Sequence, residues 1–260
     1  MFADVTSANV VGYMNVARPA ATQPNICSGS MFTNIGEDGI TLADIKITGH
    51  GATAKACRLS YIQFLMTGGS TKLDANKKYW VDENGKWRRN TGTNNPANDP
   101  EVTDAEKAEI VINPGEGFLC YLNSNAATIT YSGEVVKGLE KKISIQRPAS
   151  TQPNVIISNP SGETIDLTKI SFSGHGTTAK ACRLTYIQFF ATGGSTKLDA
   201  DKKYWVDENG KWRRNTGTNN PANDPELSDT EKAEVTIAPG MGFLCYFNTN
   251  GATLVLPTSL

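Results

Sequence analysis

Apolar and polar residues alternate with a period of two along most of the chain, which is the spacing of half-buried β-strands. In the first half this pattern predicts strands over residues 9–17, 26–33, 44–49, 56–66, 77–82, 86–90, 109–113, 117–123 and 126–132. Turn-forming residues separate them, and residues 82–86 predict a hairpin with a two-residue Asn84-Gly85 turn. The one helical signal is a capping box at Thr103, repeated at Ser228. We therefore predict an all-β protein of β-sandwich-like or barrel-like domains, each with one short helical turn.

A long internal repeat divides the chain into two homologous tandem domains. Residues 49–120 reappear at 174–245 with a constant offset of 125, and 60 of these 72 positions are identical. The identity extends through the loops, which fits either a recent duplication or a need for both copies to bind the same partner. We assign residues 12–135 to the first domain and 136–260 to the second, with residues 1–11 as an N-terminal arm.

Composition and charge narrow the function classes. The 25 Lys and Arg residues balance 26 Asp and Glu residues, so the net charge of -1 provides no field that would hold a nucleic acid. No apolar run approaches the roughly 20 residues that span a bilayer, so we expect no membrane span. The two histidines, His50 and His175, are too few for a hydrolytic triad or a zinc site in each domain. We expect a protein that is not an enzyme and that has no firmly bound cofactor.

Five cysteines form two equally spaced pairs and one orphan. Cys57 and Cys120 are 63 residues apart, as are Cys182 and Cys245, and each falls in a predicted strand. We expect one disulfide per domain, which would stabilise it by about 4 kcal/mol, with buried thiols as the alternative. Cys27 has no counterpart, and we expect a packed free thiol there. Because disulfides form in oxidising compartments, we expect an exported protein, extracellular or at the cell surface, in a mature form without its signal peptide.

The predicted hairpin is a candidate site for surface glycans. With a two-residue turn, one of its faces would carry Trp80, Asp82, Trp87 and Arg89. An indole beside a guanidinium and a carboxylate can stack a sugar ring and bind its hydroxyl groups. The second domain repeats the set as Trp205, Asp207, Trp212 and Arg214. The alternative is that these tryptophans belong to the core or to a domain interface.

The asparagine-rich loop after the hairpin is a candidate calcium site, because carboxylate and amide oxygens suit this ion. Its carboxylates in the two domains are Asp99, Glu101, Asp104, Asp224, Glu226 and Asp229. The loop matches no spaced calcium motif, and Pro96 and Pro100 could instead shape a long surface loop.

The N-terminal arm is a candidate for self-association. At offset 125, residues 7–11 align with residues 132–136, and the chain ends at Leu260, where that pattern would resume. We therefore expect the arm of one molecule to add a strand to the next, which would build an open head-to-tail filament. The apolar residues available for this contact are Val5, Val10, Val11, Tyr13, Val16 and Leu260. The alternative is an N-terminal strand folded onto its own domain.

Three segments carry a resemblance to a group of secreted bacterial surface proteins for which no activity is established. They are Asp4-Val5-Thr6-Ser7-Ala8-Asn9-Val10-Val11-Gly12-Tyr13, Pro114-Gly115-Glu116-Gly117-Phe118 and Pro239-Gly240-Met241-Gly242-Phe243. Met241 departs from the acidic residue usual at its position. The resemblance implies export. We expect a secreted structural protein that self-assembles into a surface fibre or layer, with a glycan-binding adhesin that uses the tryptophan hairpins as the alternative.

Overall fold

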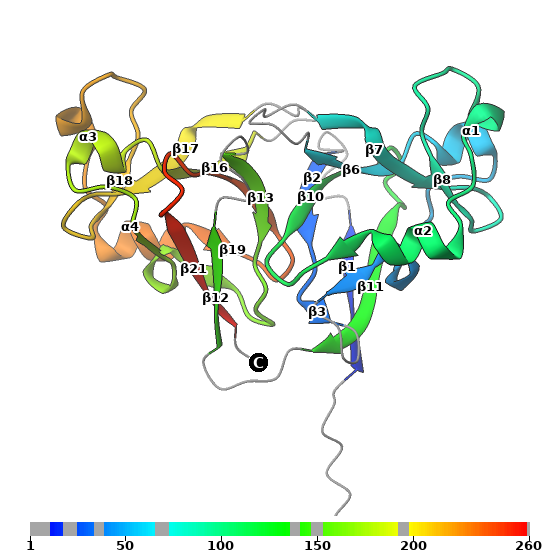
Figure 1. The fold of residues 1–260 in the computed structure, drawn as a ribbon, viewed down its shortest axis with the longest axis horizontal. Coiled ribbons are helices and arrows are strands. Elements are labelled where there is room, and N and C mark those ends of the chain that lie inside the picture. The colour runs from blue at the N-terminus through cyan, green and yellow to red at the C-terminus, as the bar shows by residue number, and fades with distance from the viewer. Residues whose placement is uncertain are drawn as a thin grey trace, which may run out of the picture.

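The computed structural model describes residues 11–17, 25–33, 39–65, 73–135, 141–146, 153–191 and 198–258. It confirms an all-β protein with two similar halves, here called unit one and unit two (Figure 1). The strands of unit one are β1 (Val11–Ala17), β2 (Asn25–Gly29), β3 (Phe32–Thr33), β4 (Ile40–Thr41), β5 (Ile45–Thr48), β6 (Tyr61–Leu65), β7 (Leu73–Val81), β8 (Trp87–Arg89), β9 (Val111–Ile112), β10 (Gly117–Tyr121) and β11 (Thr128–Val135). Those of unit two are β12 (Lys141–Gln146), β13 (Asn154–Ser158), β14 (Ile165–Asp166), β15 (Ser171–Ser173), β16 (Tyr186–Phe190), β17 (Leu198–Val206), β18 (Trp212–Arg214), β19 (Thr236–Ile237), β20 (Gly242–Tyr246) and β21 (Thr253–Thr258).

Two antiparallel sheets form the body of each unit. In unit one, five strands in the order β2-β10-β6-β7-β8 make one sheet, and β11 carries β1 on one edge and β3 and β5 on the other. Unit two repeats these sheets as β13-β20-β16-β17-β18 and β12-β21-β15. The short pairs β4-β9 and β14-β19 complete the two units.

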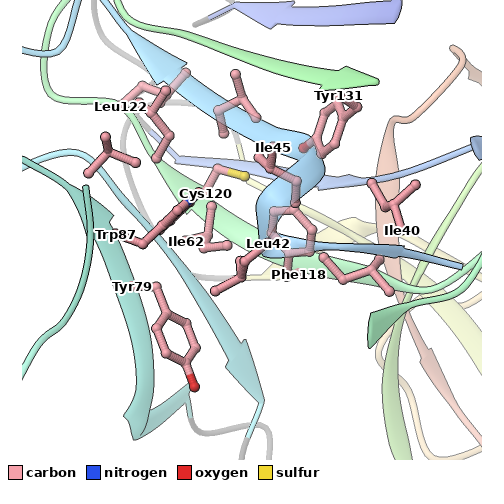
Figure 2. Close-up of a cluster of buried hydrophobic side chains, with 14 of the residues drawn as sticks. Ile40, Leu42, Ile45, Ile62, Tyr79, Trp87, Phe118, Cys120, Leu122 and Tyr131 are labelled. Atoms are coloured by element: carbon pink, nitrogen blue, oxygen red, sulfur yellow. The ribbon is translucent and has the colours of Figure 1, made fainter. Parts of the chain in front are cut away.

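Apolar side chains from both sheets of unit one pack into a single core (Figure 2). Ile62 and Phe118 come from the five-stranded sheet, and Ile45 and Tyr131 come from the other one. The rings of Phe118 and Tyr131 pack with centroids 6.2 Å apart, and each side chain of this kind contributes roughly 1.5–3 kcal/mol through burial. The equivalent core of unit two is built around Phe243.

The helical content is larger than the sequence pattern predicts. The predicted capping box is confirmed, because Thr103 caps α2 (Asp104–Glu109) and Ser228 caps α4 (Asp229–Glu234). Each unit has a second short helix, α1 (Ala54–Cys57) or α3 (Ala179–Cys182), and the last two residues of α1 replace the start of the strand predicted over residues 56–66. Thr53 starts α1 by accepting a hydrogen bond from the Ala56 amide. Short 3-10 turns complete the set: η1 (Leu42–Asp44), η2 (Pro96–Asn98), η3 (Leu167–Lys169) and η4 (Pro221–Asn223).

The N-terminal strand completes its own unit. β1 pairs with β11 from Val11↔Glu134 to Ala17↔Thr128, just as β12 pairs with β21 in unit two. Val11, Tyr13 and Val16 therefore lie in an intramolecular ladder, which confirms the alternative of an N-terminal strand folded onto its own domain. Val5, Val10 and Leu260 lie outside the described residues.

The predicted disulfides are wrong, because all five cysteines are buried free thiols. Cys57 lies on α1, where burial and then the charges of Glu83 and Asp82 raise its thiol pKa. Cys120 lies instead on β10 inside the core, near the Tyr131 hydroxyl. The equal spacing of the pairs reflects the repeat and not proximity. The expectation of a packed Cys27 thiol is confirmed, and Cys182 and Cys245 repeat the arrangement of unit one.

The two units join through a pair of equivalent contacts. Gly29 N donates to Gly240 O at 3.0 Å, and the corresponding Ser158 N donates to Gly115 O at 2.9 Å. Isolated antiparallel β-bridges lie beside these two hydrogen bonds: Ser28 pairs with Met241, and Ile157 pairs with Glu116. Between them lies a small apolar cluster that contains Cys27, Leu119, Ile156 and Leu244. The junction therefore has approximate twofold symmetry, which closes on itself and does not propagate.

Glycines allow this close approach. A Cβ at Gly117 would lie 2.8 Å from Ile156 Cγ2, and a Cβ at the equivalent Gly242 would lie 2.9 Å from Cys27 Sγ. The junction lies between the two units, and α1 and α3 lie at opposite ends of the longest axis of the molecule (Figure 1).

Candidate ligand grooves

An aspartate inside each unit organises the loop that follows the hairpin. In unit one the buried Asp99 carboxylate accepts hydrogen bonds from Arg58 Nε and Nη2, Trp80 Nε1, and the amide and hydroxyl of Thr91. Burial alone would raise the pKa of Asp99, but the hydrogen bonds from Arg58 and Thr91 outweigh it, so the pKa lies below its usual value. Arg58 also donates to Asn90 Oδ1 at 3.1 Å. These contacts fix α1 against the loop.

A groove of about 650 Å³ opens next to this network. Its walls come from α1 and the residues after it, from β6, β7 and the end of β10, and from the loop after β8. The residues that line it are Lys55, Arg58, Leu59, Tyr61, Lys78, Asn90, Asn94, Pro96, Tyr121 and Asn123. Most of them are aromatic, cationic or amide side chains.

Two stacked tyrosines form one wall of this groove. Tyr61 and Tyr121 are directly opposed on the paired strands β6 and β10, and their rings lie 5.4 Å apart at an interplanar angle of 7°. Lys78 on β7 places its Nζ 3.6 Å from the centre of the Tyr61 ring. Burial and then the positive charge of Arg58 lower the pKa of Lys78. The wall thus combines a flat aromatic surface with a partly desolvated ammonium group.

Unit two repeats this constellation in detail. Its tyrosine rings, Tyr186 and Tyr246, lie 5.3 Å apart at 6°, and Lys203 Nζ lies 3.6 Å above the Tyr186 ring. All ten lining positions have the same residue type in both units, the remaining members being Lys180, Arg183, Leu184, Asn215, Asn219, Pro221 and Asn248. Smaller cavities beside the junction differ between units, since Glu116 in one corresponds to Met241 in the other. The two identical constellations lie at the α1 and α3 ends of the molecule.

The tryptophan hairpin does not present the predicted glycan-binding face. Asp82 N donates to Lys86 O and Gly85 N donates to Asp82 O, so the loop has three residues with Gly85 at φ +79°. Trp80 consequently pairs with Arg88, and Trp87 pairs with Val81. A shift of one residue reverses the faces of a strand. Trp80 is 0% exposed and bonds to Asp99, whereas Trp87 is 5% exposed and lies in the core.

The other members of that predicted site are engaged elsewhere. Asp82 is buried and pairs with Arg88 at 2.8 Å, and Arg89 lies near Glu106. In unit two, Trp205 bonds to Asp224, Asp207 pairs with Arg213, Trp212 is in the core, and Arg214 pairs with Tyr204 across the hairpin. The expectation of a glycan site on this face is therefore wrong, and the alternative of core tryptophans is confirmed.

The predicted calcium ligands are distributed over separate ion pairs. Within the described ranges, no group of three His, Cys, Asp or Glu side chains could hold a metal ion. The acidic residues pair with basic ones as Asp99 with Arg58, Glu101 with Lys86, Asp104 with Lys107, Asp224 with Arg183, Glu226 with Lys211 and Asp229 with Lys232. The alternative of a structured surface loop describes this segment.

No protein family, curated protein or solved structure matches the chain. Among the helices of the described residues, none is both long and apolar enough to cross a membrane. The chemistry of the groove in unit one, and of the matching residues in unit two, is the guide to the ligand.

Proposed function

We propose that this is a non-enzymatic binding protein with two copies of one saccharide-binding groove, which lets a single chain bridge two ligand molecules. The observation that carries the proposal is the stacked tyrosine pair beside a lysine ammonium, repeated with the same geometry in both units. Tyrosine rings offer a flat apolar face to a sugar ring, and their hydroxyl groups remain able to bond. The amide of Asn94, which also lines the groove, supplies a further donor and acceptor for hydroxyl groups.

The position of the grooves supports bridging. Because they lie near α1 and α3, at opposite ends of the molecule, one short saccharide cannot occupy both (Figure 1). Two separate ligand chains could be held at a fixed spacing. This role agrees with an adhesive or structural protein at the cell surface. The resemblance of the N-terminal segment to secreted surface proteins supports that location, whereas the free cysteines do not.

Head-to-tail assembly through the N-terminal arm has less support. β1 is already paired inside the chain, and the junction between units is a twofold contact and not a step that repeats. We therefore favour bridging of ligands over polymerisation of the chain itself.

A glycan array followed by calorimetric titration tests the proposal. The variant Tyr61→Leu with Tyr186→Leu keeps apolar volume in both grooves but removes the flat ring and the hydroxyl group. We expect wild type to bind a saccharide and the double variant to lose most of that affinity while its circular dichroism spectrum stays the same. Tyr13→Ala is the matched control, because Tyr13 is 74% exposed on β1 and outside both grooves. Saccharide binding that survives the double variant, or an array without any bound glycan, would refute the proposal.

A further inference from the structure

Building on the proposed function, we infer that both grooves select acidic saccharides, with a ligand carboxylate at Lys78 and Arg58 and a sugar ring against the wall formed by Tyr61 and Tyr121. In unit two the corresponding groups are Lys203, Arg183, Tyr186 and Tyr246.

The charged side chains that line the groove are all cationic. Lys55, Arg58 and Lys78 face it, and no carboxylate is among its lining residues. The nearby Asp99 is fully buried behind Arg58 and already accepts five hydrogen bonds. The groove therefore presents a local positive potential on a chain whose net charge is close to zero.

Lys78 is the cation of the groove that lies against the tyrosine wall. Among the described residues it has no carboxylate within ion-pair distance, and it is half-buried against the Tyr61 ring. Its pKa is lowered first by burial and second by repulsion from Arg58. A bound carboxylate would offset both effects, whereas a neutral sugar would leave the ammonium group without a counter-charge.

Arg58 is positioned to bind the same ligand carboxylate. Its Nε and Nη2 atoms bond to Asp99, and Nη2 also bonds to Asn90, so the guanidinium plane is fixed. The Nη1 atom makes no hydrogen bond within the described part of the chain, which leaves its two N–H groups for a ligand. A fixed guanidinium edge beside an ammonium group suits the planar carboxylate of a uronic acid.

The test compares two ligands that differ at their carboxyl groups, which are charged in one and methylated and neutral in the other. Tetragalacturonate and its methyl ester are titrated into the full-length protein at equal ionic strength. We expect wild type to bind the acid roughly ten- to a hundredfold more tightly than the ester, the ratio that a hydrogen bond to a charged group provides. Lys78→Met with Lys203→Met should abolish this preference, so that the variant binds the acid and the ester with equal affinity.

A control variant with the same net charge distinguishes the effect of the groove lysines from the effect of the overall charge of the protein. Lys77→Met with Lys202→Met removes the same two charges from the neighbouring position on β7 and β17, and these side chains lie outside the grooves. This variant should keep the preference for the acid. Equal affinity of wild type for acid and ester would overturn the inference and leave saccharide binding intact. Wild type that binds a sulfated oligosaccharide and ignores tetragalacturonate would overturn the carboxylate assignment.

Discussion

Removal of the Asp99 carboxylate should be among the most destabilising single changes in unit one. Asp99→Ala deletes the acceptor for five hydrogen bonds and leaves Arg58, whose side chain is only 14% exposed, without its counter-charge. Breaking a buried ion pair from one side typically costs about 3–5 kcal/mol. Against a domain stability of roughly 5–15 kcal/mol, this loss is large.

Urea unfolding monitored by tryptophan fluorescence measures this loss, because the Trp80 indole is one of the donors to Asp99. Asp104→Ala is the control, since the Asp104 side chain is 98% exposed and pairs with Lys107 on the same helix. We expect the control to leave the free energy of unfolding nearly unchanged. In a double-mutant cycle, Asp99→Ala with Arg58→Met should be less destabilised than the sum of the single variants.

The pH dependence gives an independent check. The pKa of Asp99 is lower in the folded protein than in the unfolded chain, so its contribution is complete above the unfolded value of about 3.9 and disappears as the pH falls through the folded value. The difference between wild type and Asp99→Ala should therefore be largest near neutral pH and narrow in acid. A loss of less than about 1 kcal/mol at pH 7, equal to that of Asp104→Ala, would refute the reasoning.

Three further outcomes follow from the structure. Gly242→Ala should lower the free energy of unfolding by about 1–3 kcal/mol in thermal denaturation, because its Cβ would lie 2.9 Å from Cys27 Sγ at the junction; an unchanged midpoint would contradict this packing. A thiol assay without reductant should find five free thiols in the unfolded protein and very slow reaction in the folded one, because burial raises the pKa of Cys27, Cys120 and Cys245. Affinity for tetragalacturonate should fall as the pH rises toward the lowered pKa of Lys78, while affinity for the methyl ester stays constant; burial raises the pKa of the neighbouring Tyr61, which keeps its hydroxyl group protonated.

Much of the fold could be predicted from the sequence, because it depends on local signals. Period-two alternation identified most strands, the duplicated segment identified two similar units, and the capping box at Thr103 identified a helix start. The helix at α1 was missed because the apolar residues around Cys57 fit strand and helix patterns equally well over so few residues.

The site depended on pairings that sequence spacing does not define. One additional loop residue in the hairpin moved Trp80 and Trp87 to opposite faces, so a register error removed the predicted glycan surface. Tyr61 and Tyr121 meet only because β6 pairs with β10, which lies 60 residues further along the chain. The sequence did contain one indication of this site, because both tyrosines and Lys78 recur at strand positions in the two copies.

The most direct test of the two-groove account is the number of saccharides bound per chain, counted by native mass spectrometry with tetragalacturonate. The account predicts two ligands on wild type, one on Tyr61→Leu, one on Tyr186→Leu, and none on the double variant. A single ligand on wild type, or two ligands that remain on the double variant, would contradict it.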